Sequence, residues 1–193
     1  MKNKLAKRIL GLLVLTAVCV GVGYHLSYPI KLNMITLPKH IQDFYNRGRS
    51  AAQPPSVTLF GGVGIGDREY YLLEIGEDMD LGRVVLKRGL NGRYRIERLG
   101  YGGGNFLEGI VEDGGKKYFL FGGRDHTAQI AKIAVLIEGQ TYELPVNKPD
   151  HFLLYTEIDS RVEDNHVDRD HIMFYNAEGE NITALYDLSG GGI

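Results

Sequence analysis

The chain has 193 residues, of which 44% are hydrophobic and 24% are charged, as expected for one globular domain with an appendage. Residues 56–193 contain 14 Lys and Arg against 23 Asp and Glu, a net charge of −9. This acidic balance argues against general nucleic-acid binding, which requires basic side chains to neutralise phosphates.

The N-terminal segment predicts a membrane anchor. Residues 9–26, "ILGLLVLTAVCVGVGYHL", hold no acidic or basic side chain before His25. Eighteen helical residues span roughly 27 Å, enough for a bilayer core. Basic residues lie only on the N-terminal side, so the positive-inside rule places that end in the cytoplasm. We therefore expect a cytoplasmic tail (1–8), a transmembrane signal-anchor (9–28) and a domain outside a single-pass cell membrane protein.

Two alternatives for this segment remain open. Small residues permit signal-peptide cleavage after Gly23, and the segment also fits a buried helix of a soluble protein. A lipoprotein signal ending at Cys19 is disfavoured because Val18 precedes it. Cys19 is the single cysteine, so no intramolecular disulfide forms, and its apolar setting argues against a nucleophilic role.

Residues 29–55 predict a juxtamembrane stalk. A short helix is expected after Pro38, with Ile41, Phe44 and Tyr45 on one face. A pair of prolines then ends the helix and stiffens the connection to the next domain.

Residues 56–188 predict an all-β domain. Short apolar runs alternate with turn signals such as "NG", "DGG" and "EG", and the chain holds 26 glycines where average usage gives roughly 13 or 14. No run after residue 55 predicts a helix of three turns. The expected strands are 56–60, 68–75, 83–88, 93–99, 105–112, 116–122, 131–137, 140–146, 151–158, 171–176 and 181–187. Such spacing indicates an antiparallel sandwich or small barrel, followed by a flexible tail (189–193).

A weak internal repeat spans both halves of this domain. Tyr70 aligns with Tyr118 and Tyr94 with Tyr142, each pair 48 residues apart. Because β-hairpins resemble each other by physics alone, duplication and independent hairpins both remain open.

The second half contains the segments "KIAVLIEGQTYELPV", "HFLLYTEI" and "IMFYNAEGENIT". Over roughly residues 116–186, this hairpin pattern resembles small uncharacterised, N-terminally anchored β-domain proteins exported by Gram-positive bacteria. The resemblance implies an extracytoplasmic location and no activity.

A basic hairpin is the leading candidate for partner binding. It holds Arg83, Lys87, Arg88, Arg93 and Arg95 in an otherwise acidic domain. Lipid head groups, an anionic wall polymer or an acidic partner protein would fit such a surface. The alternative is a solvated edge hairpin whose charges prevent edge-to-edge aggregation.

The segment "VEDNHVDRDH" at residues 162–171, here called the acidic loop, is the candidate metal site. Asp164, Asp168 and Asp170 offer oxygen ligands for calcium, although the loop lacks the turn glycine of an EF-hand. The alternative is a polar loop between two strands, with charge that depends on pH through His166 and His171. Calcium is the one cofactor that the sequence suggests.

The sequence predicts a protein that is not an enzyme. It contains no G-x-S-x-G, H-E-x-x-H or S-x-x-K motif. "GGVGIGDR" at 61–68 has the glycine spacing of a P-loop but places Asp67 and Arg68 where Lys and Ser or Thr are needed, so a glycine-rich strand connection is expected. We expect a non-catalytic binding or assembly module at the cell surface. A regulatory, immunity or sensor component of a neighbouring membrane system is the alternative, and a metal-assisted hydrolase is the least favoured.

Overall fold

The computed structural model describes residues 2–47, 55–102, 104–127, 129–147, 150–186 and 188. Its helices are α1 (Lys2–Ser27), α2 (Leu37–Tyr45) and the short 3-10 helices η1 (Arg169–His171) and η2 (Thr183–Leu185). Its strands are β1 (Val57–Ile65), β2 (Arg68–Ile75), β3 (Asp80–Arg88), β4 (Tyr94–Tyr101), β5 (Phe106–Asp113), β6 (Lys116–Arg124), β7 (Lys132–Ile137), β8 (Gln140–Pro145), β9 (His151–Ile158) and β10 (Ile172–Tyr175).

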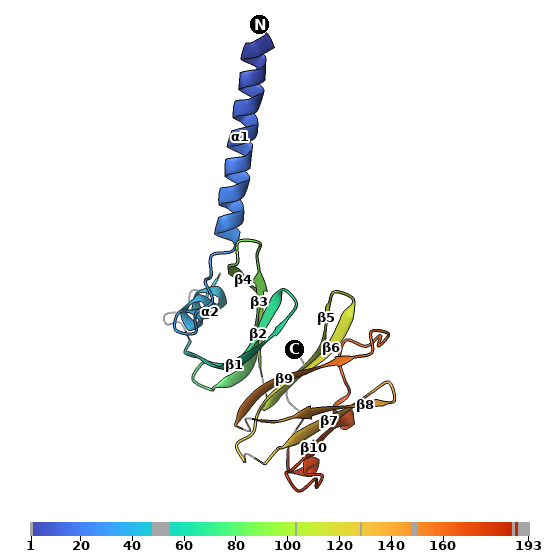
Figure 1. Ribbon diagram of the computed structural model, residues 1–193. Coiled ribbons are helices and arrows are strands. Elements are labelled where there is room, and N and C mark those ends of the chain that lie inside the picture. The colour runs from blue at the N-terminus through green and yellow to red at the C-terminus, as the bar shows by residue number, and fades with distance from the viewer. Residues whose placement is uncertain are drawn as a thin grey trace.

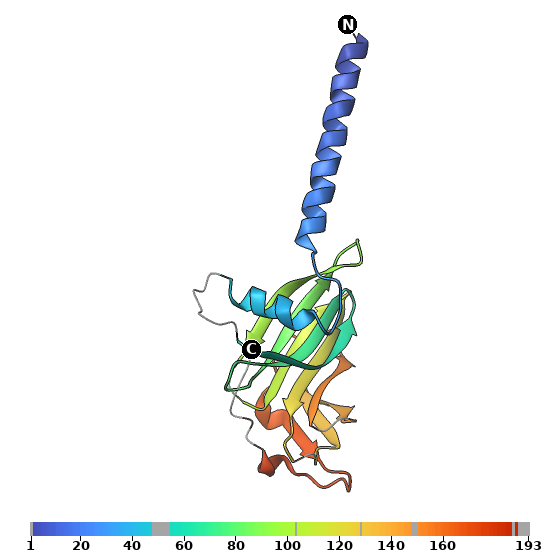
Figure 2. The same ribbon diagram turned by 90° about the vertical axis from the view of Figure 1, so that its left-hand side faces the viewer.

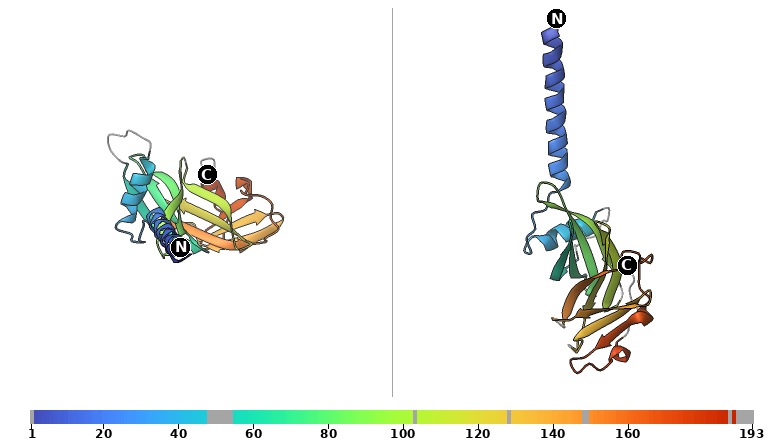
Figure 3. Two further views of the ribbon diagram at one scale, coloured as in Figure 1. Left: turned by 90° about the horizontal axis from the view of Figure 1, so that it is seen from above. Right: turned by 45° about the vertical axis from the view of Figure 1, so that its right-hand side comes forward.

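In the described part of the chain, the strands form three antiparallel sheets, with strand orders β1-β2-β3-β4, β5-β6-β9 and β10-β7-β8. The second sheet is covered on both faces. One face meets the first sheet, where Leu107 packs with Leu72 and Leu81. The other meets the third sheet, where the Phe106 and Phe174 rings lie 4.9 Å apart. The sheets follow one another across the molecule, as the view from above shows (Figure 3), and the predicted antiparallel β class is confirmed.

Two hairpin turns form where the sequence predicts them. Between β5 and β6, Gly114 and Gly115 have φ angles of +58° and +79°. Between β7 and β8, Glu138 and Gly139 have φ angles of +46° and +83°. Two consecutive residues with positive φ form the type I′ geometry, whose twist matches that of the flanking strands.

Strand β1 is longer than predicted, because the segment "GGVGI" continues the strand instead of connecting two strands. The pairing with β2 runs from Val57 to Ile65, with a bulge after Leu59. A Cβ atom at Gly62 would lie 2.5 Å from the Tyr71 ring on β2, so the absence of a side chain lets the ring lie across β1.

The predicted strand at 181–187 is wrong. Asn181 forms only an isolated bridge with Tyr175, and η2 follows. The Asn181 side chain accepts a hydrogen bond from the backbone N–H of Thr183 at 3.0 Å, and the Thr183 hydroxyl accepts one from Phe174 N–H at 2.8 Å. These side chains take the places that a strand partner would occupy, which favours a turn.

Residues 37–45 of the predicted stalk pack on the β domain. Its helix is present as α2, but α2 lies against the outer face of the first sheet (Figure 2). Leu37 and Ile41 are fully buried there, in a cluster with Leu73 and Val84. Each buried aliphatic side chain contributes about 1.5–3 kcal/mol, so residues 37–45 are attached to the sheet rather than free.

The two copies of the internal repeat pair their strands differently. β2 pairs with β3, but β6, its counterpart, pairs with β9. The second hairpin, β7–β8, consequently belongs to a third sheet. Tyr70 and Tyr118 do share one apolar cluster between the first two sheets.

Helix α1 extends away from the β domain (Figure 1). Within it, the 19 residues Ile9–Ser27 are long and apolar enough to cross a membrane, and none of that span is buried against the rest of the protein. Cys19 is exposed on this helix.

Candidate functional site

The C-terminal end of α1 is bonded to the β3–β4 hairpin. Ile30 and Tyr94 exchange two backbone hydrogen bonds, with N–O distances of 3.0 and 2.8 Å. The Tyr24 hydroxyl accepts a hydrogen bond from the backbone N–H of Leu90 at 2.6 Å. The turn between β3 and β4 points toward α1 (Figure 1). These contacts hold the last turn of α1 beside the tip of the hairpin.

Tyr28 fills the space between helix and hairpin. It is 9% exposed, its ring centroid lies 5.0 Å from that of Tyr24, and the Arg95 guanidinium lies 5.1 Å above the ring. A Cβ atom at Gly89 would lie 2.8 Å from the Tyr28 ring, so glycine is required for this close approach. Arg93 adds a hydrogen bond to the carbonyl oxygen of Pro29 at 3.3 Å.

The turn of the β3–β4 hairpin carries an exposed apolar side chain. Leu90 is 97% exposed, which is unusual for a leucine whose backbone is held in place. We name the group Tyr24, Tyr28, Leu90, Arg93 and Arg95 the collar. Aromatic, apolar and basic side chains at the end of an apolar helix are the combination that favours a membrane–water interface.

The five basic residues predicted to form one binding surface are divided by the fold. Arg93 and Arg95 belong to the collar, and Arg88 is exposed at the end of β3 beside it. Lys87 lies on the opposite face of β3, where its Nζ is 3.7 Å from Asp67. Arg83 is only 7% exposed, between the first two sheets, so it does not share an exposed surface with Arg88. Strand alternation explains the division, since neighbouring residues point to opposite faces.

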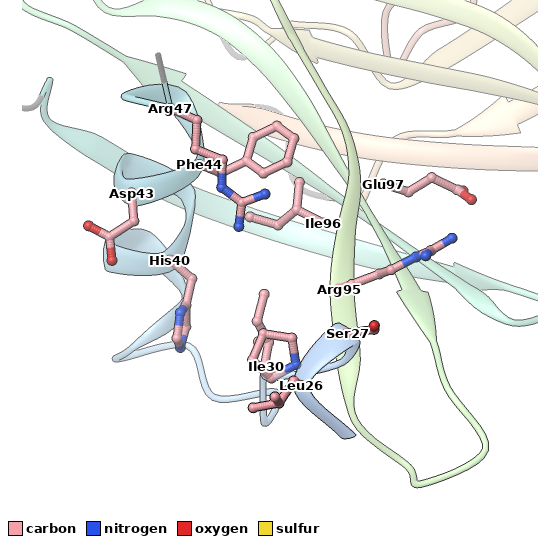
Figure 4. A pocket seen from close by; sticks show the side chains of 11 residues that line it. Leu26, Ser27, Ile30, His40, Asp43, Phe44, Arg47, Arg95, Ile96 and Glu97 are labelled. Atoms are coloured by element: carbon pink, nitrogen blue, oxygen red, sulfur yellow. The ribbon is translucent and has the colours of Figure 1, made fainter. Parts of the chain in front are cut away.

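A cavity of about 520 Å³ lies next to the collar. It is bounded by the end of α1, the following linker, α2 and β4 (Figure 4). Ile96 points toward Phe44 of α2, whereas Arg95 and Glu97 point away from that helix (Figure 4). Side chains of both charge signs line the cavity, so its charge does not select for an anion.

The three aspartates of the predicted calcium site are all exposed. Among the described residues, no group of three or more His, Cys, Asp or Glu is arranged to hold a metal ion. Asp168 instead accepts a hydrogen bond from the backbone N–H of Asp170 at 3.4 Å and caps η1. His166 and His171 are exposed as well.

Two valines hold the acidic loop in place. Val162 and Val167 are 2% and 5% exposed and belong to the core between the second and third sheets. The backbone N–H of Val167 donates to Glu108 at 3.3 Å. Burial raises the pKa of Glu108, while the Val167 hydrogen bond opposes that shift.

A polar cluster that sequence reasoning missed connects the first two sheets. Glu74, 9% exposed, accepts a hydrogen bond from Arg124 at 2.8 Å. Its same oxygen lies 3.2 Å from Nε2 of His151, and the Phe60 ring stacks on the imidazole with centroids 3.6 Å apart. Arg124 also donates to the Asn105 side chain at 3.0 Å. These residues come from distant parts of the chain, so no local spacing could reveal them.

A histidine paired with a carboxylate can act as a general base where a nucleophile lies within hydrogen-bond reach. In the residues that the structure describes, no serine, threonine or cysteine is hydrogen-bonded to His151. The cluster therefore links β2, β6 and β9, and its geometry supports no specific reaction.

Comparisons with protein-family models, with curated proteins and with solved structures found no match. The interpretation of this chain consequently depends on its own geometry, and the collar is the feature that most directly links the β domain to the apolar helix.

Proposed function

We propose that this chain is a single-pass protein of the cell membrane. Its β domain would be a non-catalytic binding or assembly module held against the outer face of that membrane. In this proposal, α1 crosses the bilayer with its N-terminus in the cytoplasm. The span Ile9–Ser27 has 19 residues, which corresponds to about 28 Å of helix and matches a bilayer core. The basic residues that precede it support the orientation.

The observation that carries the proposal is the hydrogen bond between Tyr24 and Leu90. Tyr24 lies in the last turns of α1, at the level where an interfacial aromatic residue is expected. The bond places the 97% exposed Leu90 at the same level. Leu90 would then enter the lipid interface, and full burial of a leucine contributes at most about 1.5–3 kcal/mol.

The rigid connection restricts which partners the domain reaches. The two hydrogen bonds between Ile30 and Tyr94 connect the chain just after α1 to β4, so the β domain cannot move away from the helix as it could on a flexible stalk. The domain is thereby confined to a layer next to the bilayer, where lipid head groups and other membrane proteins are the available partners. We further interpret the β domain as a layered sandwich, because its sheets pair face to face.

The position of the collar is tested with single-cysteine labels in the full chain, reconstituted in lipid nanodiscs. Cys19→Ser removes the native thiol, and Leu90→Cys then carries an environment-sensitive fluorophore. We expect blue-shifted emission that is quenched by spin-labelled lipids. The matched control is Thr141→Cys on β8, which is exposed in the sheet farther from α1. Equal, water-like emission at both positions would show that the hairpin does not meet the membrane.

Anchoring itself is tested by N-terminal sequencing and by carbonate extraction of membranes from cells that express the full chain. An intact N-terminus and retention in the membrane pellet are expected. A mature N-terminus near residue 24 would exclude the anchor, because the apolar span would then have been removed.

A further inference from the structure

Arg83 is a buried cation between the first two sheets. It is 7% exposed, and it follows the alternation of β3, so that its side chain shares a face with Val85, which packs with Leu120 of β6. The guanidinium reaches β5, where a Cβ atom at Gly109 would lie 3.4 Å from Nη2 of Arg83. This is an ordinary van der Waals distance, so the arginine head group lies directly against the backbone of β5 at Gly109.

Arg83 has no hydrogen-bond acceptor and no ion-pair partner among the described residues. Arg83 lines the adjoining cavity, together with Arg98. Burial is the largest influence on the pKa of Arg83 and lowers it, and the positive charge of Arg98 acts in the same direction. Tyr70 and the more distant carboxylate of Glu108 oppose this shift without forming a hydrogen bond or an ion pair with Arg83. A buried charge without a partner is costly, and proteins ordinarily pair such groups.

The adjoining cavity has a volume of about 410 Å³ and an excess of positive charge. Three arginines line it, Arg68, Arg83 and Arg98, against Glu97 and Glu112. Arg68 is already neutralised, since its Nε donates to Glu97 at 2.7 Å. Arg83 remains unpaired at the base of the cavity, while Arg98 is exposed at its rim.

We propose that this cavity binds a small oxyanion, with phosphate or a phosphate-bearing group as the class that fits best. Arg83 supplies the planar pair of donors that oxyanions accept in a bidentate manner, and Arg98 supplies a second positive charge at the rim. Arg83 and Arg98 outnumber the one remaining carboxylate, Glu112, so the lining keeps a net positive charge that favours an anion. The volume also accommodates a small organic substituent on the phosphate. This site is separate from the collar and does not depend on the proposed membrane contact.

The test is thermal unfolding of the full chain in nanodiscs of uncharged lipid, with inorganic phosphate compared with chloride at matched ionic strength. At about ten times the dissociation constant, bound phosphate is expected to raise Tm by about 3–6 °C. Arg83→Met should raise Tm without phosphate, because it removes an unpaired buried charge, and should abolish the response to phosphate. The matched control is Arg88→Met on the opposite face of β3, which should respond like the wild type.

Arg98→Met provides a second variant at an exposed position, where the fold tolerates substitution. It should weaken the apparent phosphate affinity by about tenfold, the size of one charge-assisted hydrogen bond of about 1.5 kcal/mol. Equal phosphate responses in wild type, Arg83→Met and Arg98→Met would overturn the proposal, as would no response of the wild type at about 50 mM phosphate.

The source of the phosphate group is distinguished by the nanodisc composition. A Tm rise that depends on Arg83 and occurs with phosphatidylglycerol alone indicates a lipid head group. A rise that requires soluble phosphate, with no effect of phosphatidylglycerol, indicates a soluble ligand. Both outcomes support an oxyanion site, whereas a phosphatidylglycerol effect that persists in Arg83→Met counts against it.

Discussion

Replacement of Asp125 by asparagine is expected to destabilise the β domain strongly. Asp125 is fully buried after β6. One carboxylate oxygen accepts hydrogen bonds from the N–H and hydroxyl of Thr127, at 2.9 and 2.7 Å, and from the Tyr186 hydroxyl at 3.1 Å. The other oxygen accepts the N–H groups of Gln129 and Ile130 at 2.9 and 3.0 Å. The side chain thereby connects the loop before β7 to the C-terminal segment.

The magnitude follows from the geometry of the amide. Asparagine replaces one acceptor oxygen with an NH2 donor. If that donor faces Gln129 and Ile130, both N–H groups lose their acceptor, and that of Ile130 is buried. If it faces Thr127, the part-buried backbone N–H of Thr127 loses its acceptor, although the two hydroxyls can rotate and accept. An unsatisfied buried group costs about 1–3 kcal/mol, so a loss of about that size is expected.

The same residue predicts a dependence on pH. Burial raises the pKa of Asp125, but the hydrogen bonds from Ile130, Thr127 and Tyr186 outweigh burial and lower the pKa below its ordinary value. The unfolded carboxyl group, with a pKa of about 3.9, therefore binds a proton more readily than the folded one. The stabilisation is present above about pH 4 and is lost as the pH falls through the folded pKa.

The assay is urea unfolding of the full chain in detergent, followed by circular dichroism between pH 3 and pH 7. Asp125→Asn should lower the midpoint at pH 7 and flatten the decline in stability at acidic pH. The control is Asp164→Asn, which removes the same charge at an exposed position. If both variants have the same midpoint, the hydrogen bonds around Asp125 do not contribute as reasoned.

Three other outcomes are expected from the same unfolding assay. Ile41→Ala, on the buried face of α2 and 0% exposed in the wild type, should cost about 2–5 kcal/mol. Ile35→Ala, 87% exposed in the wild type, should leave stability nearly unchanged, and a small loss for Ile41→Ala would mean that α2 is not attached to the sheet. Gly62→Ala should cost about 1–3 kcal/mol through overpacking, because the new Cβ atom would lie 2.5 Å from the Tyr71 ring. Gly61→Ala is the control, since its Cβ atom would have no neighbour within 4 Å. Equal stability of the two variants would contradict the close contact. Millimolar calcium should leave Tm unchanged, since the aspartates of the acidic loop do not converge, and a rise would restore the calcium hypothesis.

Local features of the chain were predictable because each depends on neighbouring residues. The turn at Gly114–Gly115 follows from two glycines, which tolerate positive φ, and the turn at Glu138–Gly139 follows from Gly139 between two apolar runs. The apolar face of α2 follows from helical spacing around Ile41, and the span Ile9–Ser27 of α1 follows from an uninterrupted apolar run, although the helix itself begins at Lys2. The strand prediction for residues 181–187 failed because the side chains of Asn181 and Thr183 form turn hydrogen bonds, which apolar periodicity does not reveal.

The candidate sites depended on long-range pairing, which a single sequence does not specify. The basic residues of the β3–β4 hairpin are close in sequence, yet successive side chains of a strand point to opposite faces. Arg83 therefore lies in the interior and Arg88 is exposed. The contact of Glu74 with Arg124 and His151 requires β2, β6 and β9 to meet across two sheets.

The sequence by itself determined the apolar helix, the antiparallel hairpins and the acidic balance of the β domain, because composition and short-range periodicity encode them. Only the tertiary structure decided that the expected stalk lies on the first sheet, that Leu90 stands beside Tyr24, and that Arg83 faces a cavity without a partner. Those features depend on which strand faces which, and that choice is made by the packing of residues far apart in the chain.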